Sequence, residues 1–142
     1  MGFLDGILGT KQETAKQQVG SSNPFSIALK FVPMRLSARK NNRIDLMVNV
    51  RNNSNEDLMV SVDAQLPRSE ILGFDPTCIN KHFEKRIGTL KPGERTEVSI
   101  PVCANSQTKD GSYPMEVTVF SHYLDYTKVL NYTKKSTTVR IV

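Results

Sequence analysis

The chain contains two histidines, the side chains best suited to acid–base chemistry near neutral pH, and neither has a catalytic partner at a recognisable spacing. His82 has only Glu84 close by in the sequence, and this stretch is typical of a solvated loop. His122 lies between Ser121 and Tyr123 and has no partner at ligand spacing. A Gly-x-Ser-x-Gly motif and a phosphate-binding glycine loop are both missing from the sequence. The sequence therefore predicts a protein that is not an enzyme.

Metal and cofactor sites have equally little support in the sequence. Asp110 and Asp125 could bind calcium in an exported sandwich, but no cluster of acidic residues accompanies them. Cys78 and Cys103 do not form a Cys-x-x-Cys motif or a Cys/His ligand spacing. They are interpreted either as free thiols in a reducing compartment or as one disulfide across the sandwich of an exported protein. We expect no metal ion and no cofactor.

An alternation of apolar and polar residues from Asn23 onward predicts strands. The apolar positions of this alternation fall in residues 25–31, 44–50, 58–66, 98–102, 113–119 and 139–141. Turn residues separate these stretches at Asn52–Asp57, Leu90–Glu94 and Lys109–Gly111. We therefore predict an all-β fold, an immunoglobulin-like antiparallel β-sandwich of about seven or eight strands, over residues 23–142.

Pro33 interrupts the first predicted strand and changes the parity of its apolar residues. The residues expected to point inward have odd numbers from Phe25 to Phe31. They have even numbers at Met34, Leu36 and Ala38. Such a switch requires either a bulge or a change of sheet, and proline supplies the break.

Three segments of the predicted sandwich resemble the cell-adhesion-related (CARDB-like) and fibronectin-like domains of archaea and bacteria. They are Val48-Asn-Val-Arg-Asn-Asn-Ser-Asn55, Leu90-Lys-Pro-Gly-Glu94, and Asp110-Gly-Ser-Tyr113 followed by Met115-Glu-Val-Thr-Val119. The resemblance covers roughly residues 25–142 and identifies a superfamily instead of one function. It implies an immunoglobulin-fold sandwich with a non-catalytic role in adhesion or interaction. A weaker similarity is to the Asn-rich sandwich domains of water-stress and hypersensitive-response proteins.

Residues 1–22 differ from the predicted sandwich. Phe3, Leu4, Ile7 and Leu8 fall at helical spacing, and a polar tract follows them. We interpret the segment as flexible or as a short amphipathic helix, which either frays or docks on a membrane or a partner. The sequence has no secretory signal pattern and no apolar run long enough to span a bilayer. We therefore expect this chain to be located in the cytoplasm, or at the cell surface if a leader has been removed.

The net charge of +5 originates in the first third of the chain, where no acidic residue lies between Glu13 and Asp45. Strand parity directs the basic side chains of this interval outward, as a positive surface patch or as a solvated, edge-protecting face. The residues of this predicted basic patch are Lys30, Arg35, Arg39, Lys40 and Arg43. An acidic protein or an anionic membrane would fit such a patch, whereas the lack of interleaved aromatic residues disfavours nucleic acid.

A Tyr-rich loop is the second candidate surface. Its predicted binding residues are Phe120, Tyr123, Tyr126, Lys128 and Tyr132. Phe120, His122 and Leu124 occupy the alternate positions of their strand that are expected to face outward. Their exposure favours contact with a protein partner, including a homodimer through an edge strand. Tyrosines packed on the sheet are the alternative. The sequence thus predicts a non-catalytic protein-interaction module of adhesion or scaffold type. The alternative function is peripheral membrane binding through residues 1–9 and the basic patch.

Overall fold

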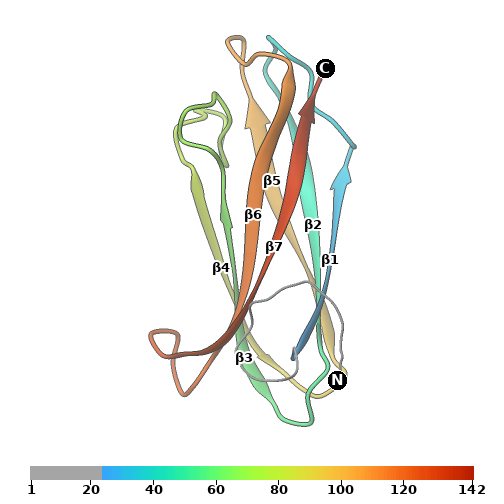
Figure 1. Cartoon of the computed structure of the whole chain (residues 1–142), viewed down its shortest axis with the longest axis vertical. Helices are drawn as coiled ribbons and strands as arrows, with labels where there is room; N and C mark the ends of the chain where they lie inside the picture. The colour runs from blue at the N-terminus through green and yellow to red at the C-terminus, as the bar shows by residue number, and fades with distance from the viewer. Residues whose placement is uncertain (1–23) are drawn as a thin grey trace, which may run out of the picture.

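The computed structural model describes residues 24–142, which form seven strands in two antiparallel sheets (Figure 1). The strands are β1 (Phe25–Val32), β2 (Asn42–Asn52), β3 (Leu58–Gln65), β4 (His82–Leu90), β5 (Arg95–Ala104), β6 (Gly111–His122) and β7 (Val129–Ile141). One sheet has the order β1-β2-β5 and the other β4-β3-β6-β7. This confirms the predicted all-β, immunoglobulin-like sandwich. The predictions for residues 1–22 lie outside the described residues.

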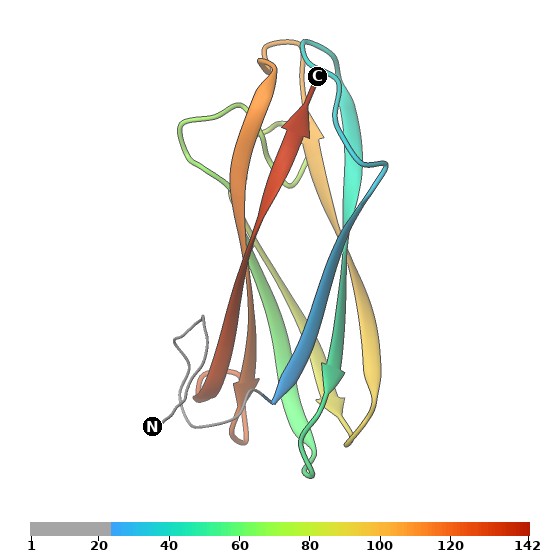
Figure 2. The ribbon, with the colours of Figure 1, turned by 45° about the vertical axis from the view of Figure 1, so that its right-hand side comes forward.

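The core lies between the two sheets and is built from the alternating apolar residues (Figure 2). Val48 and Ile100 from one sheet, and Val62 and Val117 from the other, are completely buried. Each such side chain contributes about 1.5–3 kcal/mol when it leaves water. Val60 and Val98 are buried as well, as the alternation predicts. The described residues contain no helix that could cross a membrane.

Pro33 marks the point at which the chain leaves one sheet for the other. After β1, the Leu36 amide donates to the Arg140 carbonyl at 2.9 Å, and the Val142 amide donates to the Leu36 carbonyl at 2.9 Å. Leu36 is buried and Ala38 packs against the core, so the change of sheet accounts for the switch in parity. The prediction that Met34 points inward is wrong. Its side chain is 78% exposed because it lies in the bend between the two sheets.

The Asn-rich turn is organised by one fully buried amide side chain, that of Asn52. Its Nδ2 donates to the carbonyls of Glu56 at 2.8 Å and Leu90 at 2.9 Å. Its Oδ1 accepts from the Ser54 amide at 2.8 Å and the Ser54 hydroxyl at 2.7 Å. The Gly93 amide donates to the Asn52 carbonyl at 2.7 Å. Asn52 therefore joins the β2–β3 turn to the β4–β5 turn, and with them both sheets.

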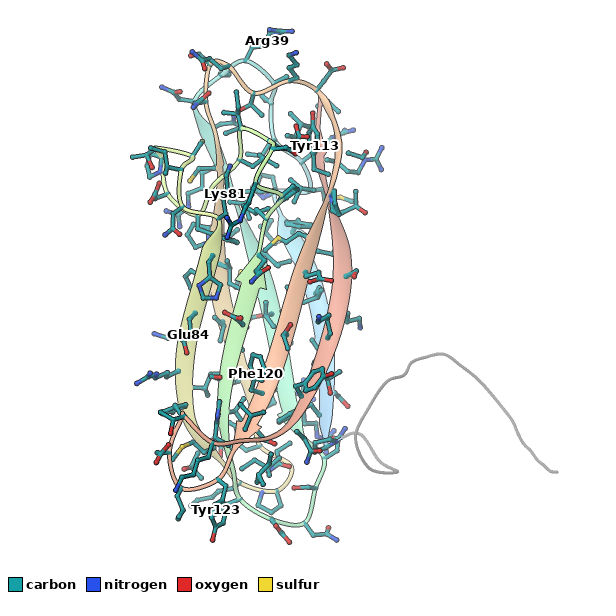
Figure 3. The ribbon with its side chains drawn as sticks, turned by 60° about the vertical axis from the view of Figure 1, so that its left-hand side comes forward. Arg39, Lys81, Glu84, Tyr113, Phe120 and Tyr123 are labelled. Carbon is teal, nitrogen blue, oxygen red and sulfur yellow. The ribbon has the colours of Figure 1, made fainter. Side chains whose placement is uncertain are left out.

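The opposite end of the sandwich has its own anchor at the start of β6. The Tyr113 hydroxyl donates to the carbonyls of Lys109 at 3.3 Å and Asp110 at 3.2 Å (Figure 3). A tyrosine early in this strand that bonds back to the preceding connection is the tyrosine corner of immunoglobulin-like sandwiches. It holds the β5–β6 connection against the strand that follows.

The long β3–β4 connection, residues 66–81, folds over the edge of β5. The Gly73 amide and carbonyl both bond to the backbone of Cys103, at 3.2 and 2.8 Å. The Lys81 ammonium donates to three carbonyls of this connection, those of Glu70, Leu72 and Cys78. Cys78 and Cys103 are both free and buried, and burial raises the pKa of each thiol. Of the two interpretations of the cysteines, the structure contains free thiols.

Replacing Asn52 with Ala should destabilise the fold because the Leu90 carbonyl would lose its partner inside the protein. We expect the free energy of unfolding to fall by about 2–3 kcal/mol. Chemical denaturation of the variant measures this change. Asn55→Ala, at an exposed position of the same turn, should change stability by less than about 0.5 kcal/mol. Equal effects of the two substitutions would contradict the role assigned to Asn52.

Replacing Lys81 with Met keeps the aliphatic stem and removes the ammonium from its three carbonyls. We expect a loss of about 1–3 kcal/mol in stability. A disulfide reagent such as dithionitrobenzoate should also react faster with Cys78 and Cys103, because the connection that buries them loosens. Lys85→Met, at an exposed position on β4, is the matched control. Unchanged thiol reactivity in Lys81→Met would show that the ammonium does not hold this connection.

Candidate functional site

The two surfaces predicted from the sequence lie at opposite ends of the sandwich. Arg35, Arg39 and Lys40 belong to the β1–β2 connection, and residues 123–128 form the β6–β7 loop. Figure 3 shows Arg39 at one end and Tyr123 at the other. The 12-residue strand β6 separates these ends by about 40 Å. One small partner therefore cannot contact both surfaces.

The residues of the predicted basic patch are exposed, but they are not equivalent. Arg43 forms an ion pair with Asp45 at 2.9 Å, so its charge is partly compensated. Arg35, Arg39 and Lys40 share one connection, whereas Lys30 lies further along β1, opposite Met47. The structure brings three of the five residues together at one end of the molecule.

The outer face of the four-stranded sheet carries an array that the sequence did not reveal. In antiparallel strands, alternate residues in register share one face. Three rows run across β4, β3, β6 and β7 in that order. They are Arg86–Ser61–Phe120–Tyr132, Glu84–Asp63–Thr118–Lys134, and His82–Gln65–Glu116–Ser136. Residues from four separate strands thus form one surface.

Small side chains near the centre of this array leave a shallow groove of about 310 Å³. Thr118, which is 9% exposed, lies on β6 between Asp63 and Lys134. Phe120 and Tyr132 line one side, with ring centroids 6.2 Å apart and planes inclined by 44°. Figure 3 views this face, with Phe120 and Glu84 labelled.

Each carboxylate on this face has a basic side chain as its partner. The three pairs are Asp63 with His82 through a hydrogen bond, Glu84 Oε2 with Arg86 Nε at 3.9 Å, and Glu116 Oε1 with Lys134 Nζ at 3.9 Å. All three are surface pairs, so each contributes at most about 1 kcal/mol to stability. Their main consequence is that the face carries no strong field of either sign. No group of His, Cys, Asp or Glu in residues 24–142 could hold a metal ion.

His122 lies on this outer face as its parity predicts, yet it is only 7% exposed. Its ring lies 5.0 Å from the ring of Tyr126, and the Arg86 guanidinium lies 4.8 Å from the centroid of Tyr126. Tyr126 therefore packs on the sheet, which was the alternative for the tyrosines of the loop. Tyr123 is exposed at the tip of the loop.

Ser61 and His122 form the one arrangement on this face that resembles a nucleophile and its base. The Ser61 Oγ lies 2.7 Å from the His122 Nε2. Ser61 is buried, and the His122 Nδ1 has no hydrogen-bond partner among the described residues. The nearby Asp125 carboxylate instead accepts from the amide and hydroxyl of Thr127. The pair thus lacks both the access and the orienting carboxylate of an activated serine.

Burial is the main influence on His122 and lowers the pKa of its ring below the ordinary value of 6.5. The nearby Lys128 carbonyl and Glu84 oppose this effect, and Arg86 reinforces it. The unfolded chain therefore binds a proton at this site more readily than the folded chain. The stability that His122 contributes is complete above its unfolded pKa and is lost as the pH falls from there towards the lower folded pKa.

We accordingly expect the stability of the protein to fall on acidification from about pH 7.5 to about pH 5. Urea denaturation across this range measures the fall. In the His122→Gln variant, the free energy of unfolding should decline less steeply with falling pH. The control is His82→Gln, which removes the exposed histidine of the same face and should keep the decline due to His122. Parallel curves for His122→Gln and the natural protein would contradict the assignment.

Comparison with known proteins supports the fold. A scan of protein-family models and a search of curated proteins give no match. A solved structure of native Escherichia coli alpha-2-macroglobulin, from domain MG7 to the C-terminus, has a TM-score of 0.58 and 19% identity. That alignment covers 84% of this chain and 16% of that one. The cryo-EM reconstruction of the native conformation of the same protein has a TM-score of 0.56 and 17% sequence identity. That alignment covers 96% of this chain and 7% of that one.

A third similar structure is the Pseudomonas fluorescens alkylpurine DNA glycosylase AlkC, with a TM-score of 0.52 and 13% identity over 87% of this chain and 32% of that one. The chain therefore spans a minor part of each of these three structures. Similarity at these identities establishes architecture alone. Together with the strand order, it establishes residues 24–142 as an immunoglobulin-like β-sandwich.

Proposed function

We propose that the protein is a non-catalytic, CARDB-like interaction module that binds a protein partner through the tip of its β6–β7 hairpin. The observation that carries the proposal is a concentration of exposed apolar side chains there. Tyr123, Leu124, Val129 and Leu130, here called the hairpin patch, are between 50% and 69% exposed. Single exposed apolar residues are ordinary, but four within residues 123–130 are typical of a contact surface.

The hairpin holds this patch in a defined shape. The Tyr123 amide donates to the Lys128 carbonyl at 2.9 Å, and the Lys128 amide donates to the Asp125 carbonyl at 3.2 Å. Leu124 has a φ of 69°, in the left-handed region that costs a residue with a Cβ about 1–2 kcal/mol. A strained backbone that keeps a leucine in water supports a functional role for that side chain.

The charges near the hairpin patch favour a protein partner over an anionic membrane. The loops at this end contain Glu56, Asp57, Glu94 and Asp125 against Lys91 and Lys128, so their charge is negative on balance and acidic lipid headgroups would be repelled. The predicted basic patch lies at the other end, and β1 begins at the hairpin end (Figure 1). The basic charge that a membrane contact would use is therefore not next to the hairpin patch.

The open edge of the same sheet favours a partner other than a second copy. The edge strand β7 carries Lys134 and Lys135 in its middle, and Lys135 donates to the Ile27 carbonyl of β1 at 2.8 Å. Two copies of β7 paired antiparallel about this point would bring like charges together. We accordingly place the contact at the hairpin patch instead of the β7 edge.

The double substitution Leu124→Ser and Leu130→Ser tests the proposal. Tagged protein, natural or variant, is used to capture proteins from an extract of the cells that produce it, and quantitative mass spectrometry compares them. The partner enriched by the natural chain should fall by about tenfold or more with the variant, since buried apolar anchors dominate most interfaces.

The matched control is Met34→Ser with Ile79→Ser, because both residues are 78% exposed and belong to connections other than the hairpin. This control should retain the partner. Equal capture by the hairpin variant, or loss of capture only in the control, would refute the assignment of the contact to the hairpin patch.

A further inference from the structure

The groove on the outer face of the four-stranded sheet is separate from the hairpin patch and has unused hydrogen-bonding capacity. Thr118 is more than nine-tenths buried and lines the groove, yet its hydroxyl bonds to no other group in residues 24–142. The Gln65 amide and the Tyr132 hydroxyl, at more exposed positions, also form no hydrogen bond with another group in residues 24–142. These groups are reached by solvent in the groove, so their donors and acceptors are free to bond to a ligand.

The electrostatics of the groove favour a neutral ligand. Asp63 is bonded to His82, and Glu116 on β6 forms an ion pair with Lys134, its diagonal neighbour on β7, at 3.9 Å. A phosphate or carboxylate ligand would need an unpaired basic side chain, and a cationic ligand would need an unpaired acid. The groove lining offers both donors and acceptors, which matches a ligand that both donates and accepts at many points.

The aromatic side of the groove adds a requirement for apolar contact. The rings of Phe120 and Tyr132 both belong to the groove lining, with their centroids 6.2 Å apart. A ligand that fits must combine an apolar C–H face with a rim of hydroxyls. Pyranose sugars have this combination, since their axial C–H groups pack on aromatic rings while their hydroxyls bond to carboxylates and amides.

From these observations we infer that the groove binds a neutral carbohydrate, with one sugar ring on Phe120 and Tyr132 and its hydroxyls directed to Thr118, Gln65 and Glu116. Its volume of about 310 Å³ is at the lower limit of small-molecule sites and suits one or two sugar rings. The groove is shallow and open, so a longer oligosaccharide can extend beyond it. This inference goes beyond the proposed protein contact and does not depend on it.

Titration of the ¹⁵N-labelled full chain with four neutral probes tests the inference: maltopentaose, cellopentaose, N-acetylchitopentaose and mannopentaose. We expect at least one probe to give saturable chemical-shift changes centred on the amides of Asp63, Thr118 and Lys134. Binding should change little between about 0.05 and about 0.5 M NaCl, because a neutral ligand releases no ions.

Tyr132→Ala should weaken the binding of that probe by about tenfold or more, the equivalent of losing one strong contact. The matched control is Tyr123→Ala, an exposed tyrosine of the hairpin patch, which should bind the probe normally. Gln65→Ala is a second variant at an exposed position, where folding is least at risk, and should also weaken binding.

Three outcomes would overturn the inference. They are the absence of saturable shifts with all four probes, shifts that map away from the groove, and equal weakening by Tyr123→Ala and Tyr132→Ala. Pentalysine and inorganic phosphate serve as charged probes, and salt-sensitive binding of either one in the groove would also refute a neutral site. The Leu124→Ser, Leu130→Ser variant should bind the carbohydrate normally, so failure of the protein contact and failure of the carbohydrate site can be told apart.

Discussion

The structure depends on one constraint, which is that each strand must direct every second side chain towards the opposite sheet. Val62 on β3 and Val117 on β6 are completely buried by this alternation. A slip of one residue would turn them to water and would bring Asp63 and Thr118 into the core. Burying a charged or polar group without a partner costs several kcal/mol, so the register is strongly specified. The outer face is therefore ordered as a consequence of the inner one.

The two ends of the sandwich are held by different means. At the hairpin end, Asn52 joins two turns through its buried amide. At the other end, Tyr113 and Lys81 bond to the carbonyls of long connections. The exposed apolar side chains of the hairpin patch thus project from an end whose neighbouring turns are fixed. A scaffold of this kind can present a contact surface at little entropic cost on binding.

Much of this architecture could be predicted from the sequence, because alternation reports directly on burial. The inward residues of most strands follow from it, and so does a break near Pro33, which the alternation alone leaves as either a bulge or a change of sheet. The exposure of the Met34 side chain could not be predicted, because the alternation does not show where the backbone leaves a strand. The distance between the basic patch and the Tyr-rich loop depends on strand order, which alternation does not encode. The groove was missed for the same reason, because Asp63, Thr118 and Lys134 become neighbours only through the pairing of three strands.

The register of the outer face is the most direct test of this account, because the core, the groove and the hairpin all follow from it. Nuclear Overhauser effects between backbone protons of facing residues measure that register in solution. The structure predicts cross-strand effects that join Asp63 to Thr118 and Thr118 to Lys134. Effects between two Hα protons, or between two amide protons, that instead join Thr118 to Val62 or to Lys135 would mean a pairing shifted by one residue, and would contradict it.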